Sequence, residues 1–221
     1  MLSRILFVFA ILSAFFANAC SASAQGAPSF TALDRARATL NSPESRLKIG
    51  DIDLTAFDFA RELEIGHGIR VIAISTNDGG GLAAFRSDGS SIETFKTEKI
   101  TWLQLFDLNE DGVSEIVTEE VDGRGTGVLQ KSFNLYGVST DEVKKLWHAE
   151  SYSLDANFTA TNGKASPREQ IGYLRFDPGG FGLPPRMAYL LILPSGVILK
   201  RESYEMRDGT ILKASEKLLR K

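Results

Sequence analysis

The chain has 221 residues, of which 28 are acidic and 25 basic, so its formal net charge is −3 at pH 7. Proteins that bind nucleic acid present a basic face, and this balance, without any polybasic run, argues against nucleic acid or an anionic membrane surface as the partner. The one cysteine excludes an intrachain disulfide, so the fold depends on a hydrophobic core.

The first 24 residues have the layout of a secretory signal. A positive charge at Arg4 precedes an apolar run over residues 5–16, and small residues continue from there to Ala24. The run is shorter than the roughly 20 residues that a membrane-spanning helix needs. We therefore predict a signal peptide over residues 1–24, no membrane span, and a periplasmic or extracellular location. Cleavage after Ala19 is a second candidate.

Cys20 offers another route of processing. The pair Ala19-Cys20 resembles the end of a bacterial lipoprotein signal, in which the cysteine becomes lipidated. Such signals usually have Leu three positions before the cysteine, where this chain has Ala17. Anchoring through Cys20 is therefore an alternative that changes the location of the protein but not its chemistry.

Residues 25–43 are predicted to form a tether followed by one short helix. The tether is small and polar up to Ser29, and a run of Asn, Ser and Pro at residues 41–43 ends the helix. The apolar residues between them recur at helical spacing: Phe30, Leu33, Ala36 and Leu40.

Residues 44–221 are predicted to form one β-rich domain with a soft boundary at 177–186, where Gly and Pro are concentrated. Turns rich in Gly separate runs of branched and aromatic residues, so we expect antiparallel sheets built from hairpins. Tips are expected at 87–89, 194–196 and 207–209, and a turn is expected at 77–81. Strands are predicted at 54–63, 69–76, 82–86, 92–97, 101–107, 115–121, 129–137, 143–153, 170–176, 187–193, 196–206 and 210–214. For 54–63 a helix is the alternative, because its apolar residues also share one helix face.

One loop between two of these strands carries recognisable chemistry. Oxygen-bearing side chains occupy every second position at Asp107, Asn109 and Asp111, with the backbone carbonyl of Val113 and the carboxylate of Glu115 continuing the series. Calcium prefers six to eight oxygen ligands, and a tight loop with this spacing turns alternate side chains to one point. Gly112 permits the turn. We therefore predict a structural calcium site at Asp107, Asn109, Asp111, Val113 and Glu115.

The segment 102–119 resembles the FG-GAP or VCBS type of repeat, and at most the resemblance extends to residue 152. Unlike an EF-hand, the loop has Thr118 at its twelfth position and strands on both sides. The resemblance implies calcium at the edge of a β-propeller blade, in exported proteins that serve adhesion or recognition. Because the chain carries no second copy of the loop and is too short for a ring of such blades, we expect a compact β domain and not a complete propeller.

A simpler interpretation of the same loop stays open. Asp and Asn side chains also cap turns by accepting hydrogen bonds from nearby backbone N–H groups. In that case Asp111-Gly112 is one more hairpin tip.

No catalytic residue is assigned. Neither His67 nor His148 has a Cys, His or acidic neighbour at zinc-ligand spacing. The neighbours Glu119 and Glu120 point to opposite faces of a strand and are interpreted as a solvated edge. Aromatic residues near Phe181 are candidates for a recognition patch.

The sequence thus favours an exported, monomeric, calcium-binding β domain that serves as a binding or structural module of the cell envelope. Its partner would be a protein or a saccharide, and nucleic acid is not expected. The alternative is an envelope hydrolase whose active site is assembled from residues far apart in the chain.

Overall fold

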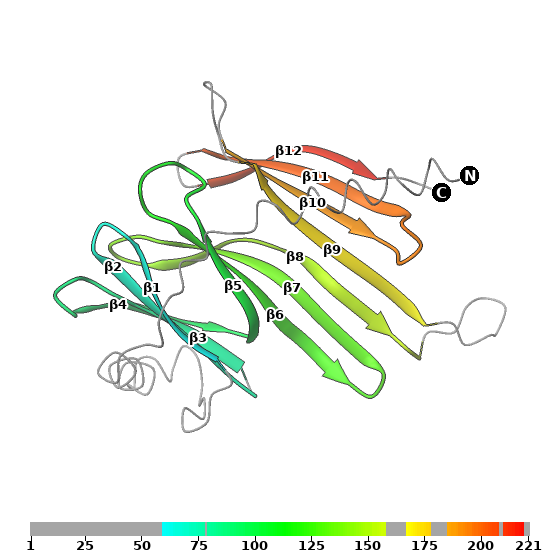
Figure 1. Cartoon of the computed structure of the whole chain (residues 1–221), viewed down its shortest axis with the longest axis horizontal. Coiled ribbons are helices and arrows are strands. Elements are labelled where there is room, and N and C mark those ends of the chain that lie inside the picture. The colour runs from blue at the N-terminus through cyan, green and yellow to red at the C-terminus, as the bar shows by residue number, and fades with distance from the viewer. Residues whose placement is uncertain (1–58, 78, 158–166, 178–184, 208–209, 219–221) are drawn as a thin grey trace, which may run out of the picture.

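A computed structural model describes residues 59–221 except 78, 158–166, 178–184, 208–209 and 219–221. Within these residues the chain forms twelve strands in two antiparallel sheets and no helix, and neither sheet closes into a barrel or propeller (Figure 1). The predicted mainly β, antiparallel fold is confirmed. The predicted signal peptide and the short helix in 25–43 lie outside the described residues. No helix in the described part is long and apolar enough to span a membrane.

The smaller sheet contains the first four strands in chain order: β1 (Phe59–Gly66), β2 (Ile69–Thr76), β3 (Gly79–Phe85) and β4 (Ser91–Thr97). The larger sheet contains the other eight, each hydrogen-bonded to the next along the chain. They are β5 (Lys99–Phe106), β6 (Glu115–Gly125), β7 (Val128–Val138), β8 (Val143–Asp155), β9 (Arg168–Asp177), β10 (Arg186–Ile192), β11 (Ile198–Arg207) and β12 (Thr210–Leu218). Each strand from β2 onward overlaps a predicted strand, because turn residues separate the runs of branched and aromatic residues.

Glycines with positive φ close two of the predicted hairpin tips. Gly89 has φ 84° between β3 and β4, and Gly196 has φ 82° between β10 and β11. At the third tip β11 and β12 pair directly from Arg207↔Thr210, although 208–209 lie outside the described residues. Likewise β9 and β10 pair from Asp177↔Arg186, so the strands on either side of 177–186 belong to one sheet.

The turn predicted at 77–81 is shorter than expected. Gly79, Gly80 and Gly81 begin strand β3 and pair with the end of β2. A Cβ atom at Gly80 would lie 2.5 Å from Thr97 Oγ1 and 2.8 Å from Glu98 O. Glycine is needed at position 80 because the segment at Thr97 and Glu98 lies too close to its backbone to leave room for a side chain. The glycine is not required by a turn.

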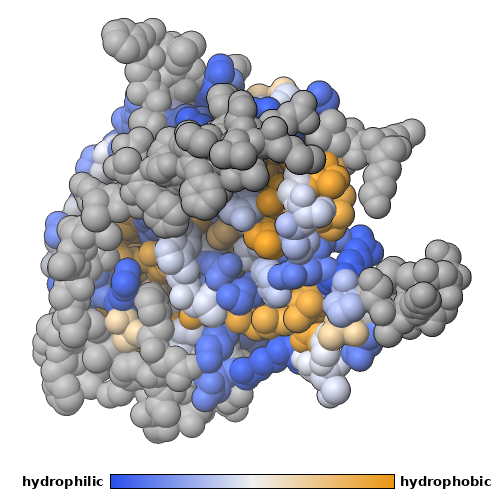
Figure 2. Space-filling model, turned by 45° about the vertical axis from the view of Figure 1, so that its right-hand side comes forward, coloured by the Kyte–Doolittle hydropathy of each residue, from blue (hydrophilic) through white to orange (hydrophobic). Residues whose placement is uncertain are grey.

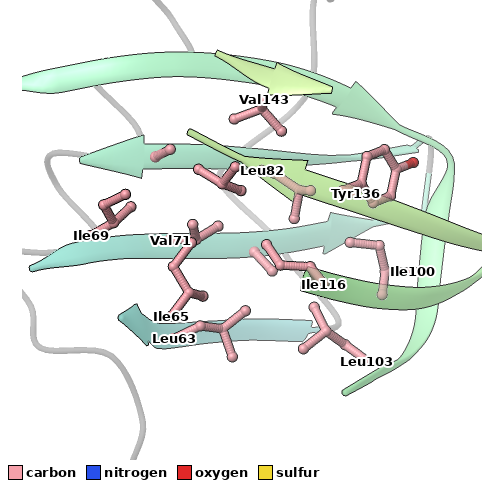
Figure 3. Packing of buried hydrophobic residues seen from close by; sticks show 13 residues of the cluster. Leu63, Ile65, Ile69, Val71, Leu82, Ile100, Leu103, Ile116, Tyr136 and Val143 are labelled. Atoms are coloured by element: carbon pink, nitrogen blue, oxygen red, sulfur yellow. The ribbon is translucent and has the colours of Figure 1, made fainter. Parts of the chain in front are cut away.

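The first hydrophobic core lies between the two sheets (Figure 3). Alternate residues of the smaller sheet meet alternate residues of β5, β6 and β7, and the Phe95 ring packs edge-on against Tyr136 with centroids 5.2 Å apart. Fully buried members include Leu63, Val71, Leu82, Ile116 and Tyr136.

A second core lies on the opposite face of β6 and β7. Val117 and Leu135 are neighbours of Ile116 and Tyr136 along their strands, so they point to the other side. There they pack with residues of the loop before β6 and of β8, β10 and β11: Leu108, Trp147, Met187, Tyr189, Tyr204 and Met206. The larger sheet therefore bends so that its last strands cover the face of its middle strands (Figure 1).

Gly172 marks the place where the larger sheet bends. A Cβ atom at this residue would lie 2.1 Å from the carbonyl oxygen of Glu150, so β9 crosses β8 in direct backbone contact. The two strands pair only over 152–155 and 168–171, and the contact begins just beyond. A side chain at position 172 would force the strands apart and open the second core.

Candidate functional site

The loop predicted to bind calcium joins β5 to β6 and is held by both cores. Leu108 is 5% exposed and belongs to the core inside the bent sheet. Val113 packs against the core between the two sheets. Two apolar side chains of one short loop thus point to opposite sides of the molecule and hold its backbone in place.

The polar side chains of the loop hydrogen-bond to its own backbone. Gly112 N–H donates to Asp107 Oδ2 at 3.0 Å, Asp111 N–H to Asn109 Oδ1 at 3.2 Å, and Val113 N–H to Asp111 Oδ1 at 2.7 Å. The Asn109 amide also donates to Asp111 Oδ2 at 2.7 Å. Gly112 has φ +83°, which explains the glycine at this position.

Glu115 closes the loop as the first residue of β6. It is 5% exposed, and its Oε2 accepts a hydrogen bond from Leu108 N–H at 2.8 Å. Burial raises the pKa of Glu115 to about 7, against the opposing hydrogen bond from Leu108, and the negative charges of Asp111 and Asp107 raise it further. The three carboxylates are therefore close enough to repel one another.

The β1–β2 turn packs directly against this loop. Ser114 N–H donates to Ile65 O at 2.6 Å. A Cβ atom at Gly66 would lie 2.0 Å from Gly112 O, and one at Gly112 would lie 3.1 Å from His67 Nε2. The smaller sheet thus reaches the loop through its first hairpin, a contact that the spacing of residues along the chain does not reveal.

The donor set fits calcium in kind and in order. Carboxylates of Asp107, Asp111 and Glu115 and the amide oxygen of Asn109 are the hard oxygen ligands that calcium prefers. In the described part of the chain, however, no three acidic, histidine or cysteine side chains are gathered closely enough to hold a metal ion. Binding therefore requires these side chains to turn from the backbone N–H groups toward one point.

Glu119 and Glu120 lie farther along β6, and neither is solvated as the sequence analysis predicted. Their side chains do point to opposite faces, as expected. Glu119, however, accepts hydrogen bonds from Thr101, Lys131 and Ser151 and is only partly exposed. Glu120 is fully buried, because the smaller sheet covers this face of β6.

Glu120 is held by neutral donors. Tyr136 OH donates to its Oε1 at 2.7 Å, Thr118 Oγ1 to the same atom at 2.5 Å, and Glu98 N–H to Oε2 at 2.9 Å. Burial raises the pKa of the Glu120 carboxyl, and these hydrogen bonds oppose the rise. No local signal in the sequence marks this buried acid.

A line of hydrogen-bonded polar side chains crosses the neighbouring strands β6, β7 and β8. Ser132 Oγ donates to Asp122 Oδ1 at 2.8 Å, Asn134 Nδ2 donates to Ser132 Oγ at 3.0 Å, and His148 Nδ1 lies 3.1 Å from Asn134 Oδ1. The hydroxyl of Ser132 therefore faces a carboxylate, and Asn134 separates it from the imidazole. This order is not that of a Ser-His-Asp triad, in which the imidazole touches the serine.

Hydrophobic side chains on the face shown in Figure 2 form separate groups between hydrophilic ones. Trp102 is 40% exposed on the edge strand β5, and its ring packs edge-on against Phe133 with centroids 6.4 Å apart. Phe181, near which a recognition patch was predicted, lies outside the described residues. Trp102 and Tyr173, which is 51% exposed on β9, are aromatic residues of the described part whose exposure the sequence analysis did not predict.

Comparisons with known proteins find no matching family model, no similar curated protein and no similar solved structure. The resemblance of 102–119 to FG-GAP or VCBS repeats therefore stays a prediction that rests on the loop itself.

Proposed function

We propose that this protein is an exported β domain that binds one calcium ion at the β5–β6 loop and serves as a binding or structural module of the cell envelope. Asp107, Asn109, Asp111 and Glu115 would supply side-chain oxygens, and Val113 would supply its carbonyl oxygen. A closed-shell ion held by so many protein ligands supplies charge neutralisation and no redox chemistry, so its role is structural.

The observation that carries this proposal is the buried position of the Glu115 carboxyl beside two other carboxylates of the same loop. A buried carboxylate normally has a cation or several donors beside it. Glu115 instead has two backbone N–H donors, those of Leu108 and of Glu115 itself, and two further carboxylates nearby, and burial raises its pKa to about 7. A divalent cation in the loop would relieve this repulsion and hold all three groups in their charged form.

The contacts of the loop indicate what the ion would do for the fold. Leu108 joins the loop to one core, Val113 joins it to the other, and the turn at Gly66 presses against Gly112. A cation that tightens the loop would therefore stabilise the meeting point of the two sheets.

Trp102 supports the role of a binding module. An exposed indole on a rigid strand offers a flat apolar surface at low cost in conformational entropy, which suits a saccharide or protein ligand.

Thermal unfolding of the purified protein with calcium and with chelator tests the proposal. A ligand that binds only the folded state adds about 2.7 kcal/mol at a hundred times its dissociation constant, so calcium should raise the melting temperature by roughly 5–10 °C. The double variant Asp107→Ala/Asp111→Ala should lose this rise. Asp141→Ala, which changes an aspartate whose side chain is 88% exposed, should keep it.

Identical melting temperatures with calcium and with chelator would reduce the loop to a turn closed by its own hydrogen bonds. Export has a separate test. Sequencing the N-terminus of protein recovered from the periplasm or medium should yield Gln25 as the first residue, whereas a lipid on Cys20 would support the anchored form.

A further inference from the structure

Strand β5 forms one edge of the larger sheet (Figure 1). Within the described part of the chain it pairs with β6 and with no other strand. The backbone N–H and C=O groups of an edge strand that point away from its neighbour can pair with a further strand, so natural proteins usually protect such edges.

The other three sheet edges are protected by charge. Charged side chains on an edge strand hinder pairing with another strand, because pairing would bring them out of water. Each of the three outer strands carries at least two such residues within its bounds: Arg61, Glu62 and Glu64 in β1, Glu93 and Lys96 in β4, and Lys213, Glu216 and Lys217 in β12.

β5 lacks this protection over most of its length. Its only charged residue is Lys99 at the first position, and residues 100–106 carry no charge and no proline. They are mainly branched and aromatic residues, which favour strands. Uncharged segments of six or seven such residues are those that add most readily to another strand. The sequence of β5 therefore suits a strand with a neighbour on both sides.

The regular part of this edge is Trp102–Phe106. A register shift between Ile100 and Trp102 interrupts the start of β5, and residues 102–106 then pair with 115–119 of β6 without a break. Five regular residues are close to the usual length of a strand. None of these five residues is a proposed calcium ligand.

Two side chains of the regular part are exposed on one face of the sheet. Trp102 and Gln104 are separated by one residue, so they point to the same side, and both are exposed. The described part of the chain leaves Trp102 40% exposed. A further strand beside β5 would cover part of this indole.

We propose that β5 pairs with β5 of a second copy of the chain, antiparallel about a twofold axis at Gln104. In this register Trp102 lies opposite Phe106 of the partner subunit, and Leu103 lies opposite Leu105 of the partner subunit. Gln104 lies opposite Gln104 of the partner subunit. Apolar residues thus meet apolar ones and no like charges face each other, which favours cross-strand pairing.

The choice of a second copy follows from this self-complementarity. A twofold contact between identical strands is closed, and the opposite edge of the sheet at β12 is charged, so association ends at two copies. The indole of Trp102 then contacts a second copy of the chain rather than a saccharide. The protein would be a dimer, in place of the monomer that the sequence analysis favoured.

Sedimentation equilibrium of the purified protein over a range of concentrations tests this pairing. The mass should rise from that of one chain to that of two. Gln104→Lys places two lysines opposite each other at the twofold axis and should weaken dimerisation by about fivefold. Leu212→Lys, which changes a residue 46% exposed on the edge strand β12, should leave dimerisation unchanged. Because Gln104 is exposed, the circular dichroism spectrum should stay the same.

A cross-linking experiment tests the register. Residues directly opposite each other on antiparallel strands have Cα atoms about 4.5–5.5 Å apart, which a disulfide can bridge. With Cys20→Ser the introduced thiol is the only one in the chain. In that background Gln104→Cys should form a covalent dimer on mild oxidation, whereas Leu212→Cys should remain a single chain.

The mass of one chain at every concentration would overturn the proposal. A dimer that Gln104→Lys leaves as strong as that of the unchanged protein would overturn it too. Equally fast cross-linking at positions 104 and 212 would show random collision and contradict the register. A protein that stays a single chain but binds an uncharged, extended synthetic peptide would assign the β5 edge to a different protein.

Discussion

Two buried glutamates, Glu115 at the start of β6 and Glu202 in β11, have charged neighbours of opposite sign. Glu202 is 2% exposed and pairs with Lys200 at 3.0 Å and with Lys213, while Tyr204 OH donates to it at 2.8 Å. Burial raises the pKa of Glu202, but the hydrogen bonds from Lys213, Lys200 and Tyr204 outweigh this and leave the pKa lowered.

Glu115 is equally buried but has carboxylates where Glu202 has lysines. Burial raises its pKa to about 7, and Asp111 and Asp107 contribute to the rise. The difference teaches that β11 and β12 carry their own counter-charge, whereas the described residues place only acidic charges near Glu115, which is the arrangement that the proposed calcium ion would neutralise. Glu120 is an intermediate case, with neutral donors and a raised pKa.

The largest expected effect comes from removing the cations around Glu202. In Lys200→Met/Lys213→Met a buried carboxylate keeps only its tyrosine, so the melting temperature should fall by roughly 10 °C. Differential scanning calorimetry checks this, with Lys217→Met on the exposed side of β12 as the control. A double variant as stable as that control would mean that Glu202 needs no counter-charge.

The next largest effect is the loss of stability when a glycine with positive φ is replaced by alanine, and it should differ between Gly66 and Gly196. Gly66 has φ +116° and no room for a Cβ beside Gly112 O, whereas Gly196 has φ +82° and nothing within 4 Å. We expect Gly66→Ala to destabilise the protein by about 3 kcal/mol and Gly196→Ala by about 1 kcal/mol. Urea denaturation measures both.

If the contact between the β1–β2 turn and the loop supports calcium binding, only Gly66→Ala should also weaken calcium affinity. Equal costs for the two substitutions would show that the turn and the loop are not packed as described.

Glu115 should make stability depend on pH in the absence of calcium. Its folded-state pKa of about 7 lies above the ordinary 4.5. Its contribution is therefore fully present below pH 4.5 and is lost as the pH rises through about 7. Allowing for solvent screening at the loop, the loss should be about 2 kcal/mol. Unfolding followed across this pH range measures it.

Glu115→Gln should flatten the pH dependence in that window, and saturating calcium should do the same by stabilising the charged form. A pH profile that Glu115→Gln leaves unaltered would assign the titration to another group. The lowered pKa of Glu202 predicts the opposite trend, a loss of stability as the pH falls through its folded-state pKa.

The smallest effect comes from removing one hydroxyl beside each of two acids. Tyr136→Phe takes a donor from Glu120, whose hydrogen-bond donors Tyr136, Thr118 and Glu98 N–H are neutral, and should cost about 1.5 kcal/mol. Tyr204→Phe takes a donor from Glu202, which keeps its lysines, and should cost about 0.5 kcal/mol. Chemical denaturation of both variants gives the difference, and a reversed order would contradict the role assigned to the lysines.

The predicted strands and hairpins agree with the structure because both depend on neighbours along the chain. Alternating apolar residues and glycines such as Gly89 and Gly196 act within a few positions. The grouping of Asp107, Asp111 and Glu115 is also a local property, since all lie within one short loop. Gly80 was misinterpreted as part of a turn because the sequence does not show what approaches its backbone.

The sequence by itself determined the antiparallel β class, the positions of the strands, and an oxygen-rich loop between two of them. Only the tertiary structure decided that Glu120 is buried, that Glu202 lies among lysines, and that the hairpin at Gly66 rests on the loop. It also decided that strand β5, uncharged from Ile100 to Phe106, lies at the edge of the larger sheet. The physical reason is that burial and charge compensation depend on how sheets bend and pack, which brings together residues that no short-range pattern connects.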